Sequence, residues 1–203
     1  MIERIVSNII ESNVFVISNE NFCFIVDAGA HLEQIEQIVG NKTVEGIILT
    51  HGHYDHCFFA REYAKKFGCK IFASVWAKEY LSDPEKNYSE GHFKIEDFSN
   101  FEFLTDNGEI NLPHFKLQYF HLGGHSKSDI LLKFENQIFV GDVIIGRYIG
   151  RMDLIGGSKK EMISSLQKLE RINYQIMHCG HGPDSDKAAQ DNVIKLWLKF
   201  LNR

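Results

Sequence analysis

The stretch T-H-G-H-Y-D-H at residues 50–56 constrains the fold more than any other part of this 203-residue chain. It places three histidines and an aspartate within six positions, directly after the apolar run V-E-G-I-I-L. At this histidine content, the pattern His-x-His-x-Asp-His arises by chance in roughly one chain in a thousand. The chain is therefore expected to fold so that a buried strand ends in a group of metal-capable side chains.

The spacing within this stretch divides it into two halves. His51 and His53 are two residues apart, so their side chains point the same way on an extended backbone. Asp55 and His56 continue into the start of a helix and can face a neighbouring position. Zinc-like ions take imidazole and carboxylate ligands, and a catalytic site keeps a position for water or substrate. One segment could thus serve two adjacent metals, although its four side chains cannot complete both sites.

The missing ligands are expected at the ends of later strands. Three candidates lie there: His125 in L-G-G-H-S, Asp142 in F-V-G-D-V and His181 in C-G-H-G-P. Each follows an apolar run and has glycine beside it, where small residues let the backbone crowd a site.

The patterning of the rest of the chain alternates strands and helices. We expect strands over 13–18, 22–26, 44–49, 70–73, 101–104, 115–120, 129–134, 137–142 and 174–179. We expect helices over 32–39, 57–67 and 74–81, one that begins at the capping box Ser158-Lys-Lys-Glu161, and a final one after Asp186. The stretch 82–91 is expected to be a surface loop. This pattern is typical of layered sheets with helices packed outside.

Length and composition limit the possible functions. A chain of 203 residues fits one domain spanning 1–203, which can bury a core without disulfides. The 22 basic and 27 acidic residues give a formal charge of −5, with no basic patch of the kind that binds nucleic acid. The first residues lack the features of a secretory signal, and no apolar run reaches the length of a membrane span. We therefore expect a soluble, cytoplasmic protein without a membrane or nucleic-acid partner.

Other reactive side chains are expected to be structural. The cysteines are too widely spaced for a thiolate zinc site or a disulfide framework; they are Cys23, Cys57, Cys69 and Cys179. The remaining histidines fit no ligand position; they are His31, His92, His114, His121 and His178.

Four side chains near the motif turns could contact an anionic substrate. They are Lys127, Arg147, Tyr148 and Arg151. A surface charge or a local ion pair is an equally good interpretation of each, so the sequence identifies no substrate-binding residue.

Five short motifs occur in order along residues 27–181. They are V-D-A-G at Asp27, T-H-G-H-Y-D-H at 50–56, G-H-S at His125, G-D at Asp142 and G-H-G-P at His181. This set resembles the metallo-β-lactamase superfamily, and within it the glyoxalase II-like hydrolases. The stretch R-M-D-L-I-G-G-S from Arg151 also resembles the R-T-D-x-x-G-G segment of short bacterial glyoxalase II-like proteins.

The resemblance implies an α+β fold, a four-layer αββα sandwich with a binuclear metal site at one edge. The implied ligands of the first ion are His51, His53 and His125. The implied ligands of the second ion are Asp55, His56 and His181. Asp142 would bridge both ions, and Asp27 would support the site without binding metal.

The chemistry of two such ions agrees with this assignment. Ions about 3.5–4 Å apart lower the pKa of a water molecule and polarise the carbonyl that it attacks. With Asp55 and Asp142 as the catalytic carboxylates, no serine or cysteine nucleophile is required, and the chain lacks a Gly-x-Ser-x-Gly elbow. The donor set favours two Zn²⁺ ions, with iron or manganese as alternatives.

Two departures from the family pattern concern the substrate. The family often has a Pro-Gly-Ser turn where this chain has Lys127-Ser128-Asp129, so we expect a loop of different shape. Long glyoxalase II proteins carry a helical domain that binds glutathione, whereas this chain has one helix after its last motif. The resemblance therefore does not imply glutathione specificity.

The sequence thus favours a hydrolase of a small thioester such as S-lactoylglutathione or a related acyl-thiol. Alternatives are a lactone or ester hydrolase and an iron-dependent persulfide (sulfur) dioxygenase. The dioxygenase uses one iron, and the intact Asp55, His56 and His181 favour two metals. The resemblance implies that β-lactamases are exported and lack an aspartate at the position of Asp142, which disfavours that activity. A non-catalytic module would be expected to have lost ligands, and the oligomeric state is not indicated.

Overall fold

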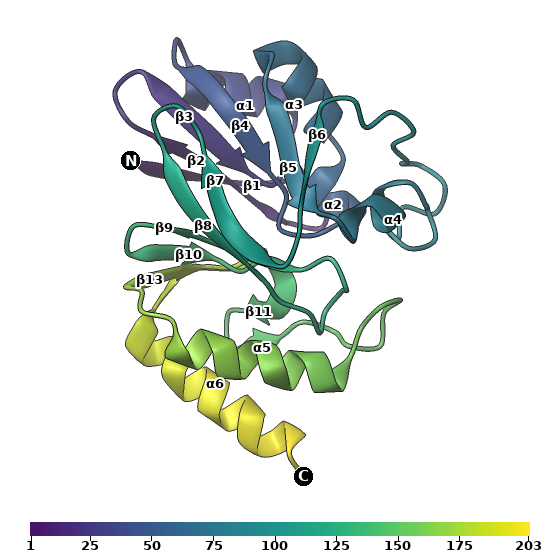
Figure 1. The fold of residues 1–203 in the computed structure, drawn as a ribbon, viewed down its shortest axis with the longest axis vertical. Helices are drawn as coiled ribbons and strands as arrows, with labels where there is room; N and C mark the ends of the chain where they lie inside the picture. The colour runs from purple at the N-terminus through teal and green to yellow at the C-terminus, as the bar shows by residue number, and fades with distance from the viewer.

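Two six-stranded β-sheets face one another in the computed structural model, which describes residues 1–203 (Figure 1). In spatial order, the first sheet contains β1 (Ile2–Val6), β2 (Asn13–Ser18), β3 (Phe22–Val26), β4 (Thr43–Ile48), β5 (Lys70–Ser74) and β6 (Phe101–Leu104). The second contains β14 (Ser185–Asp186), β13 (Ile176–His178), β10 (Gln137–Phe139), β9 (Ile130–Phe134), β8 (Lys116–His121) and β7 (Asn107–Asn111). A separate pair joins β11 (Ile144–Ile145) to β12 (Tyr148–Ile149).

Six α-helices and one 3₁₀ helix accompany the sheets. They are α1 (Leu32–Val39), α2 (Tyr54–Cys57), α3 (Ala60–Phe67), α4 (Ala77–Leu81), the 3₁₀ helix η1 (Gly141–Val143), α5 (Lys159–Arg171) and α6 (Lys187–Leu201). Figure 1 shows α1 and α3 outside the first sheet, and α5 and α6 outside the second. The expected αββα sandwich is therefore confirmed. None of the helices combines the length and apolar character needed to cross a membrane.

Three apolar clusters hold the four layers together, and β2 shows how the sequence divides between them. All six residues of β2 are buried. Phe15 and Ile17 belong to the cluster between the sheets, while Val14 and Val16 belong to the cluster under α1 and α3. Successive side chains of a strand point to opposite faces, so one apolar run serves both layers. The third cluster packs the second sheet against α5 and α6.

The predicted starts of the last two long helices are confirmed. Ser158 accepts a hydrogen bond from the backbone N–H of Glu161 at 3.2 Å. Asp186 accepts one from the backbone N–H of Ala189 at 2.8 Å. Each side chain satisfies an N–H group that has no partner within its helix.

The single helix predicted over 57–67 is wrong, because the structure divides it into α2 and α3. The backbone N–H of Phe59 donates to the carbonyl of Ala28, and the N–H of Ala28 donates to the carbonyl of His56. These long-range bonds replace the helical ladder at the break, and they fix the end of α2 against the turn after β3.

Two other predicted elements are shorter than expected. The helix predicted over 74–81 begins at Ala77, because Ser74 still pairs with Leu104 in the first sheet. The strand predicted over 137–142 ends at Phe139 and gives way to η1. Gly141 has a φ of 51°, a left-handed conformation that a strand cannot continue through.

Candidate metal centre

The strand directions bring the motif turns to one edge of the sandwich. β3 and β4 are parallel, so Asp27 after β3 and His51 after β4 lie at the same edge. β8 and β10 are both antiparallel to β9, and β10 is parallel to β13, so their carboxyl ends also coincide. These three ends carry His125, Asp142 and His181. A candidate site thus forms where both sheets present the ends of strands.

Backbone and side-chain contacts join the two sheets at this edge. Ser12 forms an isolated antiparallel bridge with His181, and the N–H of Asn13 donates to the carbonyl of Gly180 at 2.7 Å. The Ser12 hydroxyl donates to the carbonyl of Asp55 at 2.7 Å. The segment before β2 therefore fixes the turn at His181 relative to the turn at Asp55.

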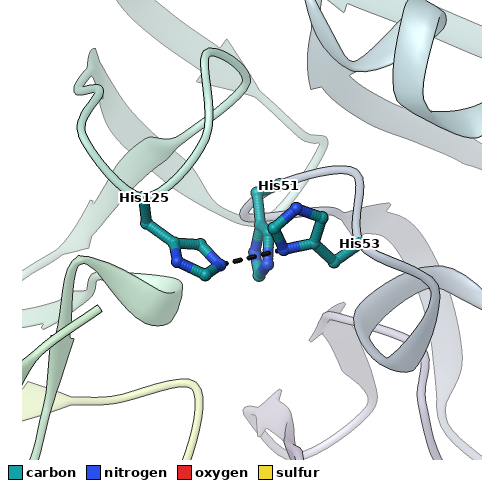
Figure 2. Close-up of side chains that lie close together, drawn as sticks. All are labelled: His51, His53 and His125. Atoms are coloured by element: carbon teal, nitrogen blue, oxygen red, sulfur yellow. Dashed lines mark hydrogen bonds between the residues drawn. The ribbon is translucent and has the colours of Figure 1, made fainter. Parts of the chain in front are cut away.

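The first group of side chains consists of three buried imidazoles, those of His51, His53 and His125 (Figure 2). One ring nitrogen from each lies within 4.8 Å of the others. His125 Nε2 lies 2.9 Å from His53 Nδ1, and His125 Nδ1 lies 3.1 Å from the carbonyl oxygen of Arg151. Because a carbonyl only accepts, His125 Nδ1 carries the hydrogen, and Nε2 presents its lone pair to the group.

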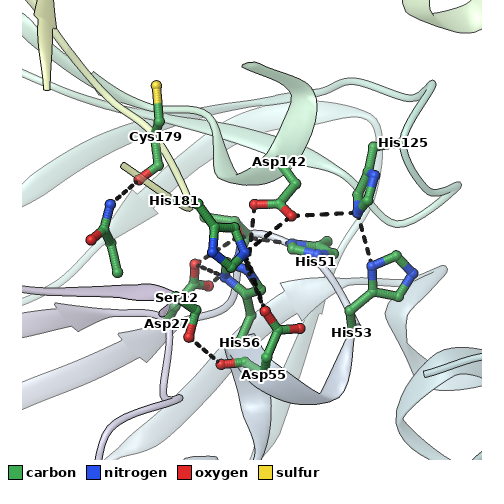
Figure 3. A network of polar contacts seen from close by, with 12 residues as sticks. Ser12, Asp27, His51, His53, Asp55, His56, His125, Asp142, Cys179 and His181 are labelled. Carbon is green, nitrogen blue, oxygen red and sulfur yellow. Dashed lines mark hydrogen bonds and ion pairs between the residues drawn. The ribbon is translucent and has the colours of Figure 1, made fainter. Parts of the chain in front are cut away.

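The second group consists of Asp55, His56 and His181, whose ligand atoms also lie within 4.8 Å of one another. His181 Nε2 is 3.2 Å from Asp55 Oδ2 and 3.3 Å from His56 Nε2. Figure 3 shows these side chains converging from both sheets.

Asp142 lies between the two groups. Its Oδ1 is 3.4 Å from His56 Nε2, and its Oδ2 is 3.4 Å from His181 Nε2 and 3.7 Å from His125 Nε2. It also combines with His51 and His56 as a third group that could hold an ion. Asp142 is thus the one carboxylate of the cluster that contacts imidazoles of both groups.

Asp27 orients two of the imidazoles, those of His56 and His51, through hydrogen bonds to their Nδ1 side. Its Oδ2 accepts hydrogen bonds from His56 Nδ1 and from the Thr50 hydroxyl, both at 2.8 Å. Since the Thr50 hydroxyl donates to Asp27, it accepts from His51 Nδ1 at 3.1 Å. Both rings therefore carry a hydrogen on Nδ1 and turn Nε2, the nitrogen that can bind a metal, toward the cluster.

Unpartnered polar atoms test whether a cation fits this arrangement. His51 Nε2 and Asp142 Oδ1 are buried, face the cluster and have no hydrogen-bond partner. Burying polar groups without partners is unfavourable, and lone pairs that face one another repel. A divalent cation that accepts these lone pairs would remove both costs, so the donor set fits a metal.

Two imidazoles of the first group, those of His51 and His53, are kept neutral at pH 7 by their surroundings. Burial lowers the pKa of His51 well below its usual range and lowers the pKa of His53 to about 3. The neighbouring imidazoles act in the same direction.

The second group holds charge instead. Burial opposes a charge on His56 and His181, but the carboxylates raise the pKa of His56 well above its usual range and that of His181 to about 9. Burial alone would raise the pKa of Asp55 and Asp142, yet these two histidines lower both. Without metal, the second group is thus a set of compensated ion pairs.

Close packing at the turns requires glycine, as the sequence indicated. A Cβ at Gly180 would lie 2.1 Å from Asp142 Oδ1, and one at Gly141 would lie 2.6 Å from the Thr50 hydroxyl oxygen. Any side chain at either position would displace an atom of the cluster or its support.

The departure at Lys127-Ser128-Asp129 forms a hydrogen-bonded loop. Asp129 Oδ2 accepts from the backbone N–H groups of His125 at 3.1 Å and Ser126 at 2.9 Å. The Ser128 hydroxyl accepts from the N–H of Gly52 at 3.0 Å. The loop that holds His125 is thereby tied to the segment between His51 and His53.

A cleft of about 260 Å³ opens over the cluster. Its polar floor is formed by cluster members from both sheets. Its remaining lining residues are Ile10, Tyr54, Tyr88, Ile145, Arg151 and Leu154. A small molecule in this cleft would contact the candidate metal ligands directly.

The structure brings together all seven side chains that the sequence singled out as ligands. They are His51, His53, Asp55, His56, His125, Asp142 and His181. The five other histidines lie outside the groups that could hold a metal, and the four cysteines are free.

Of the four side chains considered for anionic substrates, only Arg151 lines the cleft. It forms a bidentate ion pair with Asp153 at 3.0 and 2.7 Å. Lys127 Nζ instead lies 3.6 Å from the centre of the Trp76 ring.

Sequence reasoning missed Thr50 and the apolar side chains of the cleft. Thr50 stands inside the motif, but its role depends on Asp27, which is distant in the chain. Tyr88 lies in the stretch predicted only as a surface loop, and no local pattern marks it as part of a site.

Comparison with known proteins establishes the family. The family model described as the metallo-β-lactamase superfamily matches residues 9–181. The chain belongs to the metallo-β-lactamase superfamily. Among superfamily relatives, it is 29% identical over 191 residues to the probable metallo-hydrolase YqgX of Bacillus subtilis, covering 90% of each chain.

Two further relatives bear on activity. Hydroxyacylglutathione hydrolase GloC of Haemophilus influenzae is 31% identical over 173 residues, which covers 81% of this chain and 82% of GloC. The crystal structure of the B3 metallo-β-lactamase BLEG-1 superposes with a TM-score of 0.87 at 25% identity, covering 95% of this chain and 97% of that one. Similar superfamily chains thus carry the names of different activities.

Proposed function

We propose that this superfamily member is a hydrolase that uses two divalent metal ions to cleave a small thioester. The observation that carries the proposal is the convergence of two ligand groups from both sheets, with Asp142 in contact with each. The unpartnered lone pairs of His51 Nε2 and Asp142 Oδ1 favour cations at this position. Similarity to GloC supports a thioester substrate.

In this proposal, the two groups hold one ion each. His51, His53 and His125 would hold the first ion, and Asp55, His56 and His181 would hold the second. Asp142, which contacts both groups, would serve both ions, and Asp27 orients rings without serving as a ligand. Zn²⁺ suits this mixture of imidazole and carboxylate, with iron or manganese as alternatives.

In this proposal, the protein's own side chains would position the reacting groups and transfer protons. Bound divalent ions lower the pKa of a water molecule and polarise a carbonyl group. Asp55, which lines the cleft, is placed to accept a proton from the attacking water and to return it to the leaving sulfur. Asp142 holds the two halves of the site in register. The products are a carboxylic acid and a free thiol.

The proposed substrate is S-lactoylglutathione or a related acyl-thiol, and the proposed compartment is the cytoplasm. The four free cysteines fit a reducing compartment, where thiols and their esters persist.

A second candidate is hydrolysis of a lactone, an oxygen ester or the cyclic amide of a β-lactam. The observation that favours it is the close superposition with BLEG-1. The ligand groups would also suit a lactone, because the attack on its carbonyl makes the same demands.

The test combines metal analysis with a substrate panel on one preparation. We expect close to two zinc, iron or manganese ions per chain and hydrolysis of thioesters in preference to lactones, β-lactams and persulfides. A count near one iron with persulfide oxidation would contradict the proposal in favour of a dioxygenase. Preference for a lactone or a β-lactam would move the assignment to the second candidate.

Asp142→Asn isolates the central carboxylate. We expect this variant to lose the second ion and to hydrolyse thioesters at least 100-fold more slowly, because one ligand charge is removed from each ion. The matched control is Asp106→Asn, a change at an exposed carboxylate, which should leave metal content and turnover unchanged. Unchanged turnover in Asp142→Asn would refute the proposed role of this residue.

A further inference from the structure

The cleft over the cluster has an apolar wall opposite its polar floor. Ile10, Tyr88, Ile145 and Leu154 line it, and they come from four separate segments. Ile10 precedes β2, Tyr88 follows α4, Ile145 ends β11 and Leu154 precedes α5. The fold thus assembles an apolar surface beside the candidate metal ligands.

Part of this wall remains exposed to solvent. Ile10 is 60% exposed and Tyr88 is 36% exposed, whereas comparable side chains in the sheets are fully buried. A contiguous exposed apolar surface beside polar groups is typical of a binding site, since a ligand that covers it gains the hydrophobic contribution.

Tyr88 is held in an unfavourable backbone conformation. Its φ is 63°, in the left-handed region that bulky side chains seldom adopt. Its neighbours Asn87 and Ser89 are buried and fix the loop: Asn87 donates to the carbonyls of Tyr80 and Phe93, and its Oδ1 accepts from the N–H of Ser89. Surrounding contacts therefore impose a conformation that the residue alone would avoid.

This conformation points the Tyr88 ring over the site. The ring meets His53 edge to face, with 5.4 Å between ring centroids and an interplanar angle of 80°. The Tyr88 hydroxyl accepts a hydrogen bond from the N–H of Ile155 at 2.5 Å, which links the loop to the segment carrying Leu154. Tyr88 is thus both a wall of the cleft and a support for the neighbouring wall.

The cleft offers little to a highly anionic substrate. Arg151 is its only lining residue with a permanent positive charge, and it is paired with Asp153. Recognition of several carboxylates away from the reacting carbonyl would require free cationic groups that the wall does not present.

We propose that Tyr88, Ile10 and Leu154 form a subsite for an uncharged apolar group of the thioester, and that Tyr88 sets this preference. The proposal rests on the proposed function and narrows its substrate class. Of the two substrates proposed above, it favours a related acyl-thiol with an apolar acyl or thiol part over S-lactoylglutathione, which is the hydroxyacyl ester of a charged thiol.

The test measures kcat/KM along two series of thioesters. One series extends the acyl group from acetyl to hexanoyl on N-acetylcysteamine, with lactoyl as the polar comparison. The other keeps the acetyl group and varies the thiol from N-acetylcysteamine to an alkyl thiol and to glutathione. Each buried CH₂ group should raise kcat/KM about fourfold in the series whose variable part occupies the subsite.

Substitutions at Tyr88 test whether this residue causes the preference for apolar groups. Tyr88→Ala should remove most of the dependence of kcat/KM on chain length, mainly through a change in KM. Tyr88→Phe keeps the aromatic ring and should retain most of that dependence. The matched control is Tyr148→Ala, because Tyr148 is 69% exposed and does not line the cleft. A flat series in the unmodified enzyme, a preference for lactoyl or glutathione esters, or an unchanged series in Tyr88→Ala would overturn the proposal.

A separate measurement distinguishes failure of the subsite from failure of the proposed function. If the zinc-loaded protein hydrolyses no thioester, the proposed function is wrong, and binding of hexanoate and lactate is then compared by calorimetry. Tighter binding of hexanoate that is lost in Tyr88→Ala would uphold the apolar subsite. Equal binding of the two acids would reject it.

Discussion

At the scale of single residues, the two ligand groups differ in how many protons they hold. The pKa of His53 is lowered to about 3, so its ring is already neutral at pH 7. The pKa of His181 is raised to about 9, so its ring carries a proton at the same pH. Since a metal ligand must present a lone pair, an ion that enters the second group has to displace protons, and one that enters the first does not.

We therefore expect binding of the second ion to release more protons than binding of the first. Below pH 9, protons compete with metal for His181, so affinity for the second ion should fall as pH falls from 8.5 to 7, about tenfold per pH unit for each proton displaced. The first ion should show little change over this range. Calorimetric titration with zinc in buffers of different ionisation enthalpy measures the protons released. Equal release in both steps would contradict the assignment of charge to the second group.

The ligand side chains were predictable from sequence because each stands at the end of an apolar run, where strand direction alone determines its edge of the sheet. Thr50 was not predictable as a link, because the hydrogen bond from its hydroxyl to Asp27 joins turns after two different strands. Tyr88 was not predictable either, since its position over His53 depends on contacts of Asn87 and Ser89 rather than on periodicity.

At the scale of elements, the loop from His125 to Asp129 reaches the first motif through the hydroxyl of Ser128, which accepts a hydrogen bond from Gly52. We expect Ser128→Ala to lower the free energy of unfolding by about 1–3 kcal/mol, because the buried N–H of Gly52 loses its acceptor. Denaturant unfolding of the zinc-loaded protein measures this loss.

Ser164→Ala is the control for that measurement, because Ser164 is an exposed serine on α5. Its effect should stay within about 0.5 kcal/mol. If the two variants unfold at the same denaturant concentration, the hydrogen bond from Gly52 does not hold the loop.

Elements with a clear pattern of apolar residues were predicted from the sequence. Elements with a weak pattern were missed for a physical reason. β1 and β7 lie at the edges of their sheets, where β1 buries only Ile5 and β7 buries only Ile110. Such strands form because a neighbour offers hydrogen bonds, so their own side chains give little pattern. The break between α2 and α3 has the same origin, since backbone bonds to Ala28 override helical periodicity.

At the scale of the whole molecule, the candidate site lies at one edge of the sandwich, while the apolar contacts that stabilise the fold lie between its layers. Three apolar clusters join the layers without any contribution from the candidate ligands. In the metal-free protein, the charges of the second group also compensate one another. Metal should therefore add stability by binding rather than determine whether the chain folds.

We accordingly expect chelation to abolish hydrolysis and lower the melting temperature while leaving a cooperative transition. Each ion present at 1,000 times its Kd would contribute about 4 kcal/mol, which is lost on removal. Far- and near-ultraviolet circular dichroism during a thermal scan, with and without chelator, measures both effects. Loss of the near-ultraviolet signal at low temperature would show instead that the metals are structural.

The junction between the sheets also sets an order in time. Each of the three groups that could hold an ion contains side chains that follow strands of both sheets. The segment before β2 can form its bridge only after the turn at His181 has been synthesised. During synthesis, which proceeds from the N-terminus, the first sheet can form with its ligands exposed and no group complete. The groups containing His125 and Asp142 close only when the second sheet docks, and the last needs residue 181. Metal binding is therefore expected late in synthesis and folding, and only a full-length chain with both sheets docked can complete all three groups.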